Sequence, residues 1–587
     1  MLLLLTGFFL FLAHRADTER YHWSYWGFGD AQTMLTLNQW EKGGWLHNYL
    51  LFKPQGWAPT VDLLDEPELR HHARGISPAS SPRVGPRLWY THYPAGYLVP
   101  YAALYRLGVS SLYGLQLYSI AISLAALVLM YLTFSAITDT LVALIAVLFY
   151  GGSTIFLGYA DSLANQPLDD LLRFAFMLAT IFSTRVAGAG RQRCWLAVAW
   201  GLEFCLSLSS FDSVFFLYTW LVGWDLLEHR GLRWWKWLLF ALAPISAHSL
   251  QFLQNVWYLG WHDAGLDIVD AFMMKHSPGW LATAESAPPH RLTAVLFALL
   301  QVFYSIYSPS LVLLVPLALY AGYRRLFPGQ QCAGLPSFPL LLLLFSCGLG
   351  YVLVLPLAAT MAYEGRQMIP FVAMLIGGFS CSVIRTACHC WRQGHEGTRL
   401  GDRIWSRPYG YAFLGGVVLM MFWIGFVVTN RYPSPWAVGD DGVEELEFAQ
   451  YLGRLATRTA PAFFVTGGLN FKSQDYPQGY PSVAPDTEYY AGSRTILCFA
   501  NAELLANDLM TMLTLAKGED SFSPVLISDR PEQIGAVVAV LEQRKWLREV
   551  PRGIDAVQGR FLLDLTPFLD WSQSIGRPTD APPLPGS

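Results

Sequence analysis

The chain has 587 residues, of which 53% are hydrophobic, 15% aromatic and only 14% charged. Soluble globular domains carry about a quarter charged residues, so this composition indicates an integral membrane protein. The formal net charge is only -4, and without a basic stripe to neutralise phosphates the composition excludes a nucleic-acid-binding protein.

Apolar runs of about 17 to 25 residues without buried charge predict membrane-spanning helices. About eleven such runs are present, and the first is short and lacks the basic start of a signal peptide. The predicted spans are residues 1–14, 114–134, 139–158, 167–185, 194–210, 212–228, 236–259, 298–322, 337–360, 367–386 and 408–429.

Loops rich in Lys and Arg stay on the cytoplasmic side of a membrane. The basic loops "RVAGAGRQR", "EHRGLRWWK", "YRR" and "RTACHCWRQGHEGTRLGDRIWSR" all fall on the same side of the predicted topology. The "CHC" motif in the last of them has no second Cys/His pair at zinc-type spacing, so we interpret it as free thiols in a loop. We expect a protein of the bacterial plasma (inner) membrane, with its N-terminus inside and its C-terminus outside.

The composition changes after about residue 430. The segment "VEELEFAQYLGRLA" has helical periodicity, whereas "PAFFVTGG", "SPVLISD" and "GRFLLDL" are typical of short strands. We expect residues 1–430 to form a polytopic α-helical membrane domain with a large first outer loop over 15–113, and 431–571 to form a soluble α/β domain outside the membrane. The Pro-rich tail, 572–587, cannot form a packed core.

Polar residues from four separate segments fall on the predicted outer face. The segments are "GDAQ" after the first span, "WYTHYPAGY" before the second, the turn in "GYADSLANQPLDDLLRF", and "AYEGRQMIPF" at the mouth of two spans. Their convergence on one face predicts a functional site. The residues concerned are Asp30, His92, Tyr93, Asp161, Glu364 and Arg366.

Each segment also has a purely structural interpretation. Asp30 suits a solvated helix cap and Asp161 a turn former. A ring packed at the interface explains His92, and a snorkelling charge at a helix end explains Arg366. The acid pair at residues 169–170 lies in the first turn of a predicted helix, where negative charge offsets the helix dipole, so the structural interpretation is favoured there.

The arrangement resembles the GT-C class of glycosyltransferases, in particular the family of protein O-mannosyltransferases and ArnT-like lipid A aminoarabinose transferases. Members have an aspartate in the first outer loop, an acid in the next one, and a His-aromatic-Pro-Pro element before the second span. Asp30 in "GDAQ" matches the first acid, and "HYPAG" matches the His-aromatic-Pro-Pro element except at Ala95. "GRQMIP" is similar to an Arg-Tyr-x-x-Pro element, with Gln367 in place of the aromatic residue.

The resemblance implies a membrane glycosyltransferase that moves a hexosyl or pentosyl group from a polyprenyl-phosphate donor to a protein, lipid or glycan acceptor outside the cytoplasm. Asp30 would be the general base, since a carboxylate among aromatic rings is partly desolvated and therefore more basic. Asp161 would orient the sugar or the acceptor. Arg366 would clamp the donor phosphate. Further positive charge would come from Lys275, His276 and Arg291 in the outer loop before the eighth span.

The sequence requires no cofactor, and a divalent metal ion held by Asp161 with His92 is left open. The alternative function is a lipid or polysaccharide transporter or flippase without transferase activity. A transporter should carry charges near the bilayer midplane, ideally in duplicated halves. No internal repeat is visible, and we expect the interior of the membrane domain to be nearly free of charge, with exceptions at Glu203, Asp212 and His248. A third candidate, a non-catalytic scaffold, predicts no gathering of Asp30, Asp161 and Arg366.

Overall fold

The computed structural model divides the chain into two compact units, one of residues 1–26 and 93–437 and the other of residues 27–92 and 438–587. The structure describes residues 2–17, 27–46, 50–51, 94–229, 234–262, parts of 264–269, 336–354, 366–394, 450–451, 462–465, 489, 496–499, parts of 502–510, 524–528, 530–557 and 560–570.

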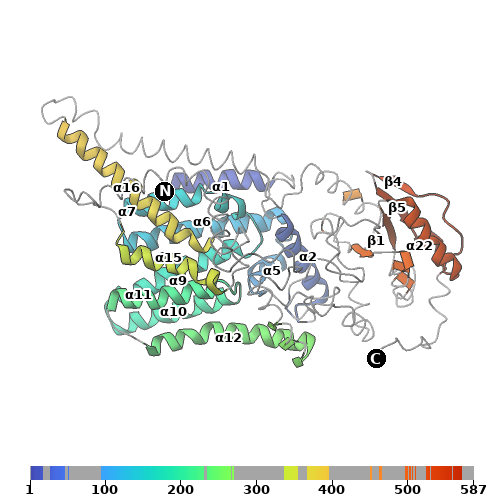
Figure 1. Ribbon diagram of the computed structural model, residues 1–587, viewed down its shortest axis with the longest axis horizontal. Helices are drawn as coiled ribbons and strands as arrows, with labels where there is room; N and C mark the ends of the chain where they lie inside the picture. Colours follow the sequence, from blue (N-terminus) through green and yellow to red (C-terminus); the bar gives the residue numbers. More distant parts are fainter. Residues whose placement is uncertain are drawn as a thin grey trace, which may run out of the picture. The chain divides into compact units, whose positions relative to one another are not determined.

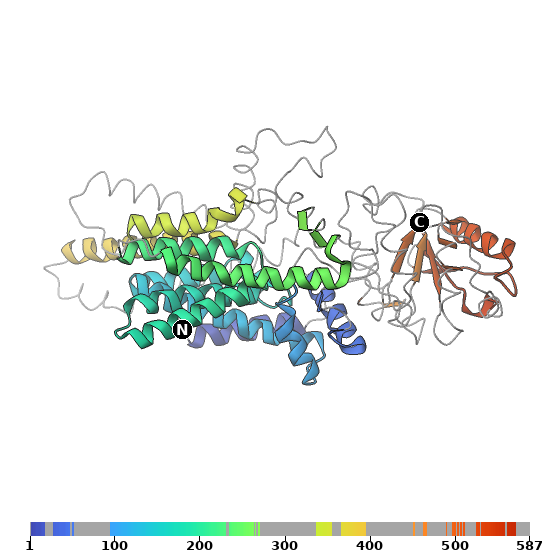
Figure 2. The ribbon, with the colours of Figure 1, turned by 90° about the horizontal axis from the view of Figure 1, so that it is seen from below.

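The first unit is a bundle of helices, most of which run lengthwise beside one another (Figures 1 and 2). Every predicted span that falls on described residues is helical, whereas the spans predicted at 298–322 and 408–429 lie outside the described residues. The helices are α1 (Leu2–Asp17), α5 (Leu98–Arg106), α6 (Leu112–Ile137), α7 (Thr140–Gly151), α8 (Thr154–Tyr159), α9 (Gln166–Arg185), α10 (Ala189–Ser207), α11 (Ser213–His229), α12 (Trp234–Leu259), α15 (Phe338–Val354) and α16 (Ile369–Gly394).

Two helix boundaries differ from the sequence prediction. The span predicted at 139–158 is two helices, because α7 ends at Gly151 and the Ser153 hydroxyl caps α8 by accepting from the Phe156 backbone N–H at 3.3 Å. Paired glycines followed by serine favour such a break. The "CHC" motif, expected in a loop, lies within α16, so that expectation is wrong. The reason is local: residues 379–393 contain neither Gly nor Pro, and α16 ends only at Gly394.

Helix α9 is central, since α6, α10 and α11 all pack against it. On one side of the bundle, α7 packs on α16 so closely that a Cβ atom at Gly377 would lie 2.5 Å from the carbonyl oxygen of Val142. Small residues permit this approach between helix backbones. Through these contacts the bundle fixes the ends of α7, α9, α11 and α16 near one another, where the polar groups described below are found.

Within the described residues, α6 is the one helix both long and apolar enough to cross a membrane by length and composition. Shorter apolar helices cover residues 5–14, 140–151 and 338–350. Helix α12 packs on α10 and α11 along the outer side of the bundle (Figure 1) and exposes a row of large apolar side chains. They are Trp234, Trp235, Leu238, Leu239, Leu242, Ile245, Leu250, Leu253 and Trp257.

The second unit contains α2 (Gly27–Gly43) and a sheet in the order β2-β1-β3-β5-β4. Its strands are β1 (Ala462–Val465), β2 (Ile496–Phe499), β3 (Val525–Ser528), β4 (Asp555–Val557) and β5 (Arg560–Asp564). Strand β1 is parallel to β2 and β3, whereas β5 is antiparallel to β3 and β4. Helix α22 (Pro531–Gln543) packs on β3 and β5.

The strands predicted in "PAFFVTGG", "SPVLISD" and "GRFLLDL" correspond to β1, β3 and β5 and are confirmed. Strands β2 and β4 were not predicted. β4 has only three residues, too few to show an alternating pattern, whereas β2 is an apolar run as long as β1 and β3 and was overlooked. Apart from helical residues 450–451, the helix predicted in "VEELEFAQYLGRLA" lies outside the described residues, as does the tail 572–587.

Candidate functional site

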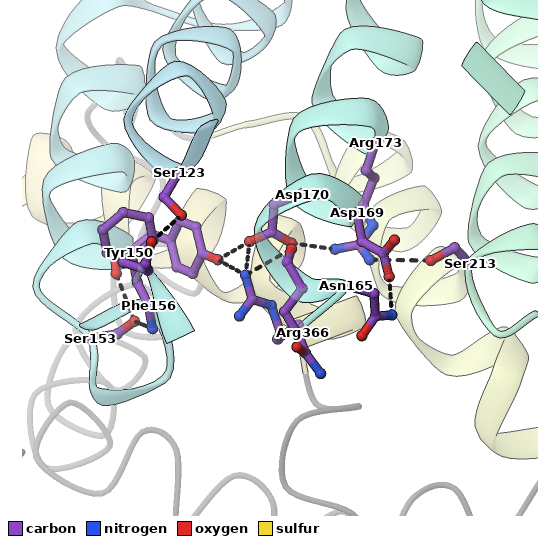
Figure 3. A network of polar contacts seen from close by, with 12 residues as sticks. Ser123, Tyr150, Ser153, Phe156, Asn165, Asp169, Asp170, Arg173, Ser213 and Arg366 are labelled. Atoms are coloured by element: carbon purple, nitrogen blue, oxygen red, sulfur yellow. Dashed lines mark hydrogen bonds and ion pairs between the residues drawn. The ribbon is translucent and has the colours of Figure 1, made fainter. Parts of the chain in front are cut away.

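A cluster of buried charged and polar side chains lies at the N-terminal end of α9, within the first unit (Figure 3). It draws on the end of α7, the start of α9, the start of α11 and the residues just before α16. We call it the Asp170 cluster. Its members are Tyr150, Asn165, Gln166, Asp169, Asp170, Arg173, Asp212, Ser213, Arg366 and Gln367.

Asp170 is the acceptor at the centre of the cluster. Its carboxylate accepts from the Tyr150 hydroxyl, from Arg173 Nη1 at 3.0 Å and from Arg366 Nη2. The side chains of both ion pairs are at most 6% exposed. Removing one member of a buried ion pair leaves an uncompensated charge and costs about 3 to 5 kcal/mol, so these four side chains depend on one another.

Arg366 is held by hydrogen bonds through Nη2, whereas its other two nitrogens are buried without a partner in the described residues. Its Nη2 also donates to the Tyr150 hydroxyl and to the Gln166 carbonyl oxygen, both at 3.3 Å, while its Nε and Nη1 have no hydrogen-bond partner in the described part of the chain. The guanidinium lies 5.4 Å from the centre of the Tyr159 ring, a distance typical of a cation–π contact. At 5% exposure, Arg366 does not fit the alternative of a snorkelling surface charge.

The charge of Arg366 is held firmly despite burial. Burial lowers the pKa of its guanidinium, but the nearby Asp170 carboxylate more than offsets burial, so the pKa lies above its ordinary value. Arg366 is therefore a permanent cation in a nearly dry environment. In such an environment its attraction for an anion is stronger than it would be in water.

A second set of contacts joins α9, α11 and the residues before α16. Asn165 Nδ2 donates to Asp169 at 2.8 Å. The hydroxyl of Ser213 accepts from Arg173 Nη2 at 3.5 Å and from Gln367 Nε2 at 3.4 Å. Asp212, next to this hydroxyl in sequence, is fully buried and interacts electrostatically with Asp169. Hydrogen bonds and ion pairs thus connect the cluster from Tyr150 to Ser213, and Asp212 directly precedes Ser213 in the chain.

Two of the predicted site segments meet in this cluster. Arg366 contacts Tyr159 and the Gln166 carbonyl, which flank the turn containing Asp161. Asp161 itself is only 2% exposed and has electrostatic or hydrogen-bonding partners of its own. A turn former in solvent would be exposed, so the burial of Asp161 does not fit the alternative of a solvated turn residue.

Asp30 lies in the first turn of α2, in the second unit. It is 2% exposed and has a partner, so the alternative of a solvated cap does not fit. The predicted gathering of Asp30 with Asp161 and Arg366 stays a prediction. His92, Tyr93, Glu364, Lys275, His276 and Arg291 lie outside the described residues.

Sequence reasoning missed Tyr150 and Arg173 and assigned Asp170 only to the helix dipole. A signal was present, because Asp170 and Arg173 are three residues apart in a predicted span and therefore share one helix face. Charge inside a predicted span also calls for a buried partner. More charge is buried in the described helices than expected, including the Lys236–Asp225 pair at 2.6 Å between α12 and α11.

None of the described residues form a group of three or more His, Cys, Asp or Glu side chains placed to hold a metal ion. His92 is not among the described residues, so the option of a metal held by Asp161 and His92 stays open.

No protein-family model matches the chain, and no curated protein matches it in sequence. In structure it is similar to ArnT from Cupriavidus metallidurans bound to undecaprenyl phosphate, with 12% identity and a TM-score of 0.45 over 91% of this chain and 93% of that one. It is also similar to the archaeal oligosaccharyltransferase AglB from Archaeoglobus fulgidus, in complex with an inhibitory peptide and a dolichol-phosphate, with 11% identity and a TM-score of 0.41 over 92% and 72%.

A third similar structure is the arabinofuranosyltransferase AftD from Mycobacteria, with 15% identity and a TM-score of 0.36 over 88% of this chain and 36% of that one. Each of these TM-scores lies below 0.5, so the resemblance to GT-C glycosyltransferases stays a likeness. These identities and TM-scores assign no activity, so the function proposed below depends on this chain's own residues.

Proposed function

We propose that the protein is a membrane glycosyltransferase that moves a sugar from a polyprenyl-phosphate donor to an extracytoplasmic protein, lipid or glycan acceptor. The observation that carries the proposal is the contact of Arg366 with both flanks of the Asp161 turn inside a buried site. These residues belong to two of the segments on which the GT-C resemblance was recognised. The apolar α6 and the exposed apolar face of α12 support a membrane setting.

Arg366 supplies the phosphate-binding group in this proposal. Asp170 and Tyr150 hold its Nη2, while Nε and Nη1 remain for the donor phosphate. A guanidinium already fixed by neighbours loses little conformational entropy when the ligand arrives. Asp170 acts as a positioning residue for Arg366. The other proposed donor-binding residues are His92, Tyr93, Glu364, Lys275, His276 and Arg291.

The reaction breaks the bond between the anomeric carbon and the phosphate oxygen and forms a bond from the same carbon to the acceptor. Asp30 accepts the proton of the acceptor nucleophile as the new bond forms. The polyprenyl phosphate leaves with the electron pair of the broken bond, and Arg366 stabilises its developing negative charge. Asp161 orients the sugar or the acceptor near the reacting carbon, where positive charge develops.

A lipid or polysaccharide flippase is the second candidate, favoured by the buried charges of the Asp170 cluster and of the Asp225–Lys236 pair. A flippase moves its lipid without changing it chemically. Transport assays would therefore detect movement of the sugar lipid across a vesicle bilayer with its glycosyl phosphate bond intact.

The test is to purify the full-length protein with native lipid, identify bound polyprenyl phosphate by mass spectrometry, and supply pooled polyprenyl-phosphate sugars with a membrane extract as the source of acceptor. The proposal expects a bound polyprenyl phosphate and release of free polyprenyl phosphate as sugar is transferred. A protein that binds no polyprenyl phosphate, or that moves sugar lipids only intact, contradicts it.

A further inference from the structure

Several buried polar atoms of the Asp170 cluster have no hydrogen-bond partner within the described part of the chain. Buried polar groups in native proteins are almost always hydrogen-bonded, so a concentration of exceptions points to a missing ligand. The oxygen atoms are Oδ1 of Asp169, both Oδ of Asp212, Oε1 of Gln166 and Oε1 of Gln367. The nitrogen atoms are Nε of Arg173 and both Nε and Nη1 of Arg366.

These atoms belong to one connected site. Arg173 and Gln367 both donate to the Ser213 hydroxyl, and Asp212 precedes Ser213 in the chain. Asp169 interacts electrostatically with Asp212. All of the side chains are at least nine-tenths buried, with Asp212 at 0% and Gln367 at 3% exposure. Acceptors and donors without partners therefore lie together inside one buried region.

The mixture of donors and acceptors decides among ligand classes. A cation would satisfy the oxygen atoms and leave the guanidinium nitrogens without partners. A phosphate accepts hydrogen bonds and would satisfy only the nitrogens. A hydroxyl donates one hydrogen bond and also accepts, so a ligand with several hydroxyl groups would satisfy both kinds of atom.

We propose that this array is the subsite for the sugar of the lipid-linked donor, a furanose or pyranose with free hydroxyl groups. Asp169 and Asp212 accept hydrogen bonds from sugar hydroxyls, and Arg173 Nε donates to a hydroxyl oxygen. The sugar is the donor's because Gln367 follows Arg366 directly, and the phosphate proposed to bind at Arg366 is separated from the sugar by a single glycosidic oxygen. The inference therefore rests on the proposed function.

The experiment compares two lipids on purified full-length protein in nanodiscs. One probe is undecaprenyl phosphate, and the other is undecaprenyl phosphate linked in turn to glucose, mannose or arabinose. Wild-type protein should bind at least one sugar lipid about tenfold more tightly than the bare lipid phosphate. In Asp212→Asn this preference should be lost, while affinity for the bare lipid phosphate stays within about twofold.

Glu203→Gln is the matched control. Glu203 is a fully buried carboxyl on α10. Among the described residues neither of its oxygen atoms has a hydrogen-bond partner, and it shares no hydrogen bond or ion pair with the Asp170 cluster. Glu203→Gln replaces a carboxyl by an amide, as Asp212→Asn does, but outside the cluster. It should therefore bind the sugar lipid and the bare lipid phosphate as tightly as wild-type protein. Asp169→Asn is the second test variant, and the melting temperature of each variant reports folding.

The outcomes distinguish failure of the sugar subsite from failure of the proposed function. If Asp212→Asn and Asp169→Asn keep the preference for the sugar lipid, the sugar subsite is wrong. It is also wrong if they lower the affinity for both lipids equally and have a lower melting temperature. Wild-type protein that binds the bare lipid phosphate but prefers none of the sugar lipids overturns the subsite and leaves the phosphate site standing. Wild-type protein that binds neither lipid overturns the proposed function itself.

Discussion

At Arg366, the two sides of one guanidinium have different environments. Nη2 is held by Asp170, Tyr150 and the Gln166 carbonyl, whereas Nε and Nη1 are buried without a partner in the described residues. Asp170 thus fixes the direction in which the remaining N–H groups point. A lysine ammonium is a compact charge on a flexible stem and cannot hold Asp170 while presenting a planar group to a phosphate.

We therefore expect Arg366→Lys to lower sugar transfer about tenfold or more, although the positive charge is kept. Arg185→Lys is the matched control, because Arg185 lies at the other end of α9 in a partly exposed pair with Glu228 at 2.8 Å. Exposed ion pairs contribute at most about 1 kcal/mol. Equal donor affinity and rate in Arg366→Lys and wild-type protein would remove Arg366 from phosphate binding.

Part of this site could be predicted from sequence. The turn at Asp161 and the "GRQMIP" motif stand out because only 14% of the residues are charged, whereas the position of Asp30 relative to them stays a prediction. The pairing of Asp170 with Arg366 could not be predicted, because 196 residues separate them and only tertiary packing brings them together. In the first turn of a helix, an acid that interacts with the dipole looks the same in sequence as one that holds a distant arginine.

Among the elements, helix positions were predictable because long apolar runs have few alternative structures. The breaks between helices and the contacts between them were less predictable. The short capped turn at Ser153 divides α7 from α8, and the absence of a Cβ atom at Gly377 lets α16 approach α7 closely. Neither feature changes the average hydrophobicity of a window, which is the signal that identifies a span.

The close approach at Gly377 gives a stability prediction. Gly377→Ala places a methyl group 2.5 Å from the Val142 carbonyl oxygen, which forces α7 and α16 apart and should cost about 1 to 3 kcal/mol. Gly201→Ala on α10 is the control, since a Cβ atom there meets nothing within 4 Å. The melting temperature in detergent should fall for Gly377→Ala alone. Similar melting temperatures for the two variants would be inconsistent with the helix contact.

The buried Asp225–Lys236 pair joins α11 to α12, and Trp237 Nε1 also donates to Asp225 at 3.3 Å. Asp225→Asn leaves the Lys236 charge buried without its partner and should lower stability by about 3 to 5 kcal/mol. Removing the charge as well, in Asp225→Asn/Lys236→Met, should restore much of the loss. A double variant as unstable as the sum of the two single changes would argue against a direct interaction.

For the whole molecule, the proposal requires the second unit to lie outside the cytoplasm. The asymmetry of basic loops predicts this orientation. In a variant without native cysteines, Gln474→Cys should react with an impermeant thiol reagent in intact cells. Gly190→Cys, within the predicted cytoplasmic segment "RVAGAGRQR" and at the start of α10, should react only after the cells are opened. The reverse labelling pattern would overturn the proposed outer location of Asp30 and Arg366.

The central claim is that Asp30 is the general base of a sugar transfer, and the most direct measurement is the transfer rate of Asp30→Asn with a polyprenyl-phosphate sugar donor. The substitution keeps the shape of the side chain and removes its proton acceptor. We expect donor binding to persist and transfer to fall by roughly two to four orders of magnitude. Asp161→Asn should lower the transfer rate less, and part of that loss should come from weaker substrate binding. Transfer by correctly folded Asp30→Asn protein within a few-fold of the wild-type rate would contradict the claim.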